Sequence, residues 1–66
     1  MTQGTVEWFS DSKGFGAIRA ENGIEVPVHF SAIRDDGLRT LAQGDEVRFE
    51  IRETETGLHA ANVIRN

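Results

Sequence analysis

The 66-residue sequence contains no cysteine and no tyrosine, and only one tryptophan and one proline. The absence of cysteine excludes a disulfide framework and any thiolate metal site. No apolar run approaches the roughly 20 residues that a membrane-spanning helix needs. The start MTQGTVEWF has neither the basic end nor the apolar core of a secretory signal. We therefore expect one cytoplasmic domain over residues 1–66, without a membrane partner.

Positive charge is also scarce in this chain. Seven Lys and Arg stand against eleven Asp and Glu, which gives a formal net charge of -4. Proteins that bind nucleic acids usually carry a basic footprint, because neutralising phosphates releases counterions and drives binding. A nucleic-acid binder with this composition has to concentrate its positive charge locally or bind weakly.

Five short segments rich in β-branched and aromatic residues predict strands, over residues 4–9, 14–20, 25–30, 46–54 and 58–64. Turn residues separate them, and the stretch 31–45 predicts a short turn followed by a long loop. Five strands without a convincing helix predict an all-β protein. At this length a closed antiparallel barrel is favoured, because closure removes exposed sheet edges. Pro27 indicates an edge strand, since proline donates no hydrogen bond to a neighbour.

Alternation within these segments divides the side chains between two faces of the sheet. Val26, Val28 and Phe30 share one face of their segment, and His29 lies on the other face. In the same way Phe15 lies opposite Ile18. The expected core contains Val6, Ile18, Val26, Val28, Val47, Ile51 and Val63. Three phenylalanines are further candidates for the core: Phe9, Phe30 and Phe49.

The segment KGFGAIR, residues 13–19, places two glycines around Phe15. Glycine weakens a strand but allows another molecule to approach its backbone. Together with the outer faces of the neighbouring strands, this segment predicts an aromatic patch of Trp8, Phe15, His29 and Phe30, with Lys13 and Arg19 at its margin. Flat rings interleaved with cations suit unpaired bases, each of which has a π-face that stacks.

Catalytic and metal sites are not indicated. His29 and His59 have no cysteine or acidic partner at metal-ligand spacing, and no serine lies in a nucleophile motif. The segment GFG is not a phosphate-binding loop, because it lacks the longer glycine–lysine pattern of that motif. We therefore expect a protein without enzymatic activity, cofactor or metal.

The segments GTVEWFSDSKGFGAI, VPVHFSAI, GLRTLAQGDEVRFEI and AANV resemble bacterial cold-shock proteins over nearly the whole chain. The resemblance implies a five-stranded antiparallel barrel of the oligonucleotide-binding fold, the OB-fold. It also implies an RNA chaperone or regulator of transcription or translation that binds single-stranded RNA or DNA, pyrimidine-rich strands among them. We expect this protein to be a monomer. The nucleic-acid-binding residues that it implies are Trp8, Lys13, Phe15, His29, Phe30 and Arg39.

The chain departs from this family mainly on the presumed ligand face. Ala17 and Pro27 stand where the family usually has phenylalanine, Leu38 stands where an aromatic is common, and Glu7 replaces a typical lysine. Ser10, Leu58 and His59 also differ from the usual residues. Each missing stacking ring costs about 1–3 kcal/mol of binding free energy, so we expect weaker binding than in a typical member. The alternatives are a fold that has drifted to protein interaction, or a redesigned variant selected for stability.

Overall fold

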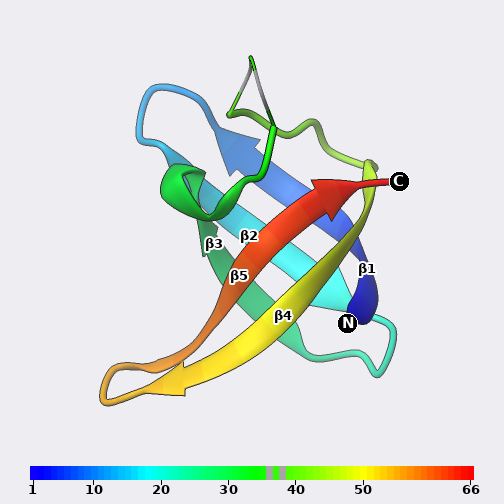
Figure 1. Ribbon diagram of the computed structural model, residues 1–66, viewed down its shortest axis with the longest axis vertical. Coiled ribbons are helices and arrows are strands. Elements are labelled where there is room, and N and C mark those ends of the chain that lie inside the picture. The colour runs from blue at the N-terminus through cyan, green and yellow to red at the C-terminus, as the bar shows by residue number, and fades with distance from the viewer. Residues whose placement is uncertain (36, 38) are drawn as a thin grey trace.

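The computed structural model describes residues 1–35, 37 and 39–66. Its five strands are β1 (Thr2–Ser10), β2 (Phe15–Ala20), β3 (Glu25–His29), β4 (Glu46–Thr54) and β5 (Gly57–Arg65). A single turn of 3-10 helix, η1 (Phe30–Ala32), follows β3 and lies beside the upper part of β5 (Figure 1). The five predicted strands are therefore present, with ends that differ from the expected ones by up to two residues.

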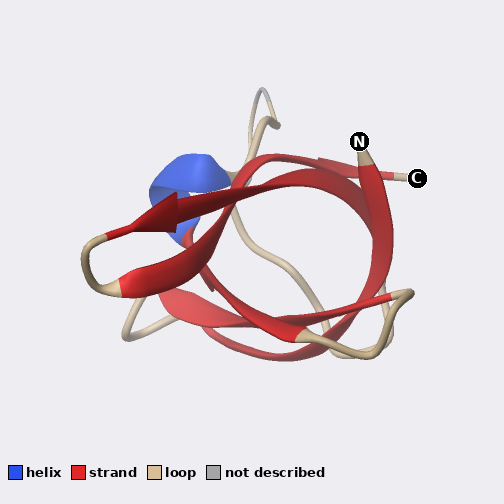
Figure 2. Cartoon of the chain, turned by 90° about the horizontal axis from the view of Figure 1, so that it is seen from below, coloured by secondary structure: helices blue, strands red, loops and turns tan. Residues whose placement is uncertain are grey.

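The strands form one sheet in the order β3-β2-β1-β4-β5, and every adjacent pair is antiparallel. The sheet coils on itself, so that β3 and β5 approach each other and the strands enclose a ring (Figure 2). A parallel bridge between Ile33 and Val63 helps to close this ring, and the Arg34 amide donates to the Val63 carbonyl at 2.8 Å. The predicted all-β OB-fold barrel is confirmed.

The interior of the barrel is filled by aliphatic side chains around one phenylalanine. Phe49 is fully buried, which assigns it to the core. The buried cluster consists of Val6, Ile18, Ala20, Val26, Val28, Ile33, Leu41, Val47, Phe49, Ala60 and Val63. Of the core residues expected from alternation, only Ile51 is half-buried, and it packs against this cluster together with Phe9.

The face predicted for Phe30 is wrong. Alternation places it inward with Val26 and Val28, but its side chain is 41% exposed. The strand ends at His29, and the chain turns into η1 at Phe30, so the two-residue period no longer applies there. Pro27 lies as expected on a strand at the end of the hydrogen-bonded order.

A bulge in β1 sets the direction of the side chains beside Trp8. The register with β2 shifts between Val6, which faces Ile18, and Trp8, which faces Ala17. The extra residue of a bulge bends its strand and increases the twist. Glu7 is that extra residue, so Glu7 and Trp8 both occupy the outer side of the sheet.

Gly16 is required where β1 and β2 come closest. A Cβ atom there would overlap the Trp8 carbonyl oxygen and lie 2.7 Å from the Phe9 Cα. Since both contacts are to backbone, rotating a side chain cannot relieve them.

Candidate nucleic-acid interface

Four rings form an exposed strip across β1, β2, β3 and η1, which we call the aromatic platform: Trp8, Phe15, His29 and Phe30. The Trp8 and Phe15 ring centroids are 5.5 Å apart, with an angle of 73° between the planes. The His29 and Phe30 centroids are 4.5 Å apart, at 42°. Phe15 and His29 are paired across β2 and β3. The structure thus joins all four predicted rings into one surface.

The platform is unusually open for apolar side chains in so small a protein. Trp8 is 44% exposed and Phe15 is 42% exposed, close to the value for Phe30. Aromatic residues are usually buried in a core, and Phe49 supplies that function here. The exposed rings are therefore available to stack on a ligand.

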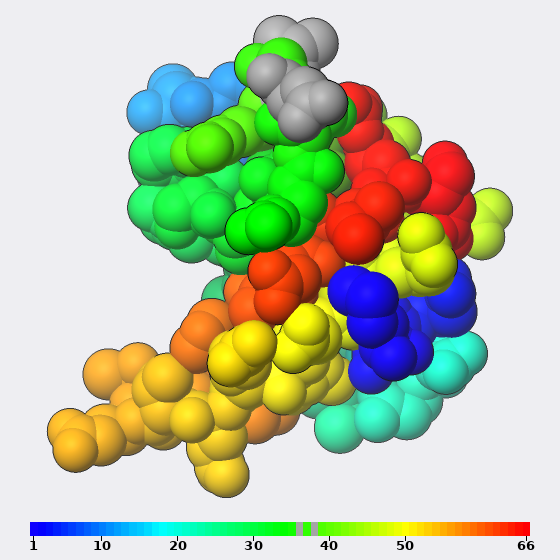
Figure 3. Space-filling view, in the orientation of Figure 1, coloured from blue at the N-terminus to red at the C-terminus, as the bar shows by residue number. Residues whose placement is uncertain are grey.

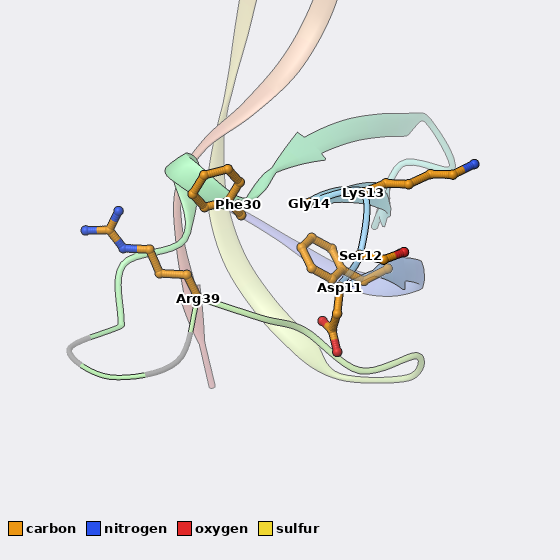
Figure 4. Close-up of a pocket in the computed structure, with 7 residues that line it drawn as sticks. Asp11, Ser12, Lys13, Gly14, Phe30 and Arg39 are labelled. Carbon is orange, nitrogen blue, oxygen red and sulfur yellow. The ribbon is translucent and has the colours of Figure 1, made fainter.

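A pocket of about 310 Å³ lies at the η1 end of the platform, and its lining includes the two cations among the predicted binding residues, Lys13 and Arg39. Phe30 forms one wall of the pocket, and Asp11, Ser12 and Gly14 of the β1–β2 turn line it as well (Figure 4). The side chains of Lys13 and Arg39 extend to opposite sides of the Phe30 ring, away from each other (Figure 4). All six predicted site residues therefore belong to one continuous region.

Gly14 has a backbone conformation that favours glycine. Its φ of 75° lies in the left-handed region, which favours glycine. A Cβ atom at this position would also lie 2.9 Å from the Phe30 ring. The glycine therefore lets the β1–β2 turn lie directly against a ring of the platform.

The two positions where the family usually has phenylalanine lie at the middle of this surface. Ala17 pairs with Trp8 on one side and with Pro27 on the other. It is only 6% exposed, yet it does not belong to the core cluster. Its small side chain lies on the outer face and is covered by its neighbours, so the row of platform rings has a gap at Ala17, in the sense of a position without a ring. Leu38, the third such position, lies outside the described residues.

Arg19, predicted at the margin of the patch, is already engaged within the protein. Its Nε forms an ion pair with the Glu7 carboxylate, and its Nη1 donates to the Gly23 carbonyl at 3.1 Å. Glu7, which stands where the resemblance implies a lysine, therefore offsets the charge of a cation at the margin of the platform.

A second group of basic side chains lies beside the platform and was not predicted from the sequence. Between η1 and β5 lies a pocket of about 390 Å³, which we call the η1–β5 pocket. Its lining comprises His29, Ser31, Ala32, Arg34, Arg52, His59, Ala60, Ala61 and Asn62. Arg52 lies on β4, and no sequence signal brought Arg34 and His59 together. Closure of the barrel does so.

Within residues 1–35, 37 and 39–66, no group of three or more His, Asp or Glu side chains is arranged to hold a metal ion. The same part of the chain contains no helix long and apolar enough to cross a membrane.

The family profile for the "'Cold-shock' DNA-binding domain" matches residues 2–66. The chain is 52% identical over 63 residues to "Cold shock protein CspC" of Bacillus subtilis, which covers 96% of each protein. It is 53% identical over 66 residues to "Cold shock-like protein CspD" of Bacillus cereus, with full coverage of both. The solved structure "drosophila Unr CSD456" superposes with a TM-score of 0.80 at 27% identity, over 98% of this chain and 26% of that one.

Proposed function

The chain belongs to the cold-shock domain family, whose members bind nucleic acids, and on this premise we propose that its aromatic platform binds single-stranded RNA or DNA. Successive bases stack on Trp8, Phe15, His29 and Phe30, while Lys13 and Arg39 contact phosphates. The observation that carries this proposal is the exposure of contiguous rings outside a core that is already filled. Base–aromatic stacking contributes about 1–3 kcal/mol per base and tolerates different sequences.

The proposal includes several finer properties of the protein. Residues 1–66 act as one monomeric, cytoplasmic unit without enzymatic activity. It binds pyrimidine-rich strands and acts as an RNA chaperone or as a regulator of transcription or translation. The gap at Ala17 and Pro27, together with the neutralised Arg19, makes its affinity lower than that of a family member with the full set of rings.

A fluorescence titration with hexathymidine tests this proposal directly. The chain has one tryptophan and no tyrosine, so the emission reports from Trp8 alone. We expect saturable quenching that weakens with salt, because the affinity for a single strand changes with a log–log slope of about 0.7 per neutralised phosphate. Absence of quenching at every accessible concentration would instead favour a cold-shock fold that has changed to protein interaction.

A pair of variants separates the platform from general surface effects. Phe15→Ala removes a platform ring, and we expect about 5- to 150-fold weaker binding, the equivalent of about 1–3 kcal/mol. Ile24→Ala is the matched control, because Ile24 is 45% exposed but lies in the β2–β3 turn, outside the platform. Equal effects of the two substitutions would contradict the stacking proposal.

A further inference from the structure

The η1–β5 pocket gathers four basic or ionisable side chains from separate parts of the chain. His29 ends β3, Arg34 follows η1, Arg52 lies on β4 and His59 lies on β5. None of the described residues that line it is acidic. In a protein with a net charge of -4, a lining with two arginines, two histidines and no carboxylate is a local exception to the overall composition. Figure 3 shows the surface hollowed between the green segment around η1 and the orange part of β5.

The two walls of the pocket are held together by backbone contacts. Ile33 forms a bridge with Val63, and the Arg34 amide donates to the Val63 carbonyl at 2.8 Å. The backbone of Arg34 is therefore fixed against β5, and its side chain lines the pocket together with Asn62. Within the described part of the chain, Arg34 has no carboxylate in ion-pair distance. Its guanidinium is available to an external anion.

Glu50 lies behind the opposite wall and orients two of its donors. One carboxylate oxygen accepts from Arg52 Nη2 at 3.0 Å, and the other accepts from Asn62 Nδ2 at 2.8 Å. Asn62 is the one non-glycine residue with a positive φ, 51°, in the part of the chain that the structure describes. It adopts this conformation beside the register shift between β4 and β5. Glu50 therefore forms an ion pair with Arg52 and offsets its charge, as Glu7 does for Arg19, although Glu50 itself does not line the pocket.

His29 connects this pocket to the aromatic platform. Its Nδ1 accepts a hydrogen bond from the Ser31 amide at 3.3 Å and lies 2.8 Å from the Ser31 hydroxyl. With Nδ1 accepting, a neutral ring carries its proton on Nε2 and donates from there. The ring itself packs against Phe30. A strand whose bases stack on the platform therefore passes directly from His29 to the pocket.

We infer that the η1–β5 pocket binds a backbone phosphate of the nucleic acid, beyond the bases that stack on the aromatic platform. Guanidinium groups suit this ligand, since their planar fork of donors matches phosphate oxygens. Arg34 is the principal contact, and Arg52 and His59 face it across the cavity. The inference rests on the proposed function, because it requires that the platform bind a strand. It assigns a place where a net acidic protein gains affinity for a polyanion.

The test compares Arg34→Gln with Arg48→Gln in Trp8 fluorescence titrations with octathymidine at several salt concentrations. Both substitutions remove one positive charge, but Arg48 is an exposed residue of β4 outside the pocket. The affinity falls as salt rises, and we expect Arg34→Gln to make the slope of log affinity against log salt shallower by about 0.7. This corresponds to about fivefold weaker binding at roughly 0.1 M salt. Arg48→Gln should leave the slope unchanged.

Each outcome of this test has a distinct meaning. Equal effects of the two variants, with normal quenching in the unmodified protein, would overturn the phosphate site and leave the platform intact. No quenching in the unmodified protein would refute the proposed function, and the inference with it. Inorganic phosphate, followed by the NMR signal of the Arg34 guanidinium, distinguishes the source of the anion. If phosphate shifts that signal while Arg34→Gln leaves octathymidine binding unchanged, the pocket binds free anions and the assignment to nucleic acid is wrong.

Discussion

Replacing Ala17 with phenylalanine adds a ring at the gap in the aromatic platform. Ala17 lies on β2 between Trp8 and Pro27 in the neighbouring strands, and outside the core cluster. A larger side chain there projects over the outer face, so the core keeps its packing. One additional stacking surface contributes about 1–3 kcal/mol. We therefore expect Ala17→Phe to bind hexathymidine about 5- to 150-fold more tightly. Because Ala17 is covered by its neighbours, the added ring has to displace them, and we expect the free energy of unfolding to fall by about 1–3 kcal/mol.

The assay is the Trp8 fluorescence titration, accompanied by thermal unfolding of the same samples. Gln43→Phe is the matched control, because it adds the same ring to an exposed loop position away from the platform. An additional Pro27→Phe change should strengthen binding further, by less than the sum of the two changes, since neighbouring rings interact. An affinity of Ala17→Phe within twofold of the starting protein, in a variant that the melting curve shows to be folded at the assay temperature, would refute the stacking explanation.

Three further predictions concern the fold and its charges. Gly16→Ala should reduce the free energy of unfolding by about 3 kcal/mol or more, because the added Cβ meets backbone atoms. Gly37→Ala is the control and should change that free energy little, since nothing lies within 4 Å of the Cβ position there. Urea unfolding measures both variants, and similar midpoints would contradict the close-approach interpretation. Phe49→Ala should cost about 3–5 kcal/mol, a large part of the roughly 3–10 kcal/mol available to a chain of this length, and calorimetry should show a melting temperature lowered by more than about 12 °C. Glu7→Gln should free Arg19 from its ion pair and steepen the salt dependence of oligonucleotide binding by about 0.7, and an unchanged slope in salt titrations would show that Arg19 does not reach phosphate.

The sequence was sufficient for the parts of the site that depend on local periodicity. Strict alternation in residues 14–20 and 25–30 identified the outer faces of two strands, and with them Phe15 and His29. Alternation failed at Phe30, because a 3-10 turn begins there and a two-residue period carries no information about where a strand ends. The aromatic patch predicted around residues 13–19 also included Phe30, and its 41% exposure agrees with that prediction and not with the alternation.

Charge pairing shows the same division between local and distant information. The sequence contains seven Lys and Arg, and its net charge predicts that a nucleic-acid binder has to concentrate them locally. It does not indicate which of these cations form ion pairs within the protein. Arg19 and Glu7 are twelve positions apart, and a bulge in β1 brings them into contact. An ion pair across two strands depends on their register, which composition does not specify.

By itself, the sequence determined the all-β class, the positions of the strands and the family to which the chain belongs, because these follow from short-range patterns of apolar, aromatic and turn residues. Only the tertiary structure decided which exposed groups meet. Closure of the barrel places His29, Arg34 and His59 around one pocket, and the close contact of β1 with β2 makes glycine necessary at position 16. These contacts join residues far apart in the chain, and they form only when the sheet coils and closes on its core.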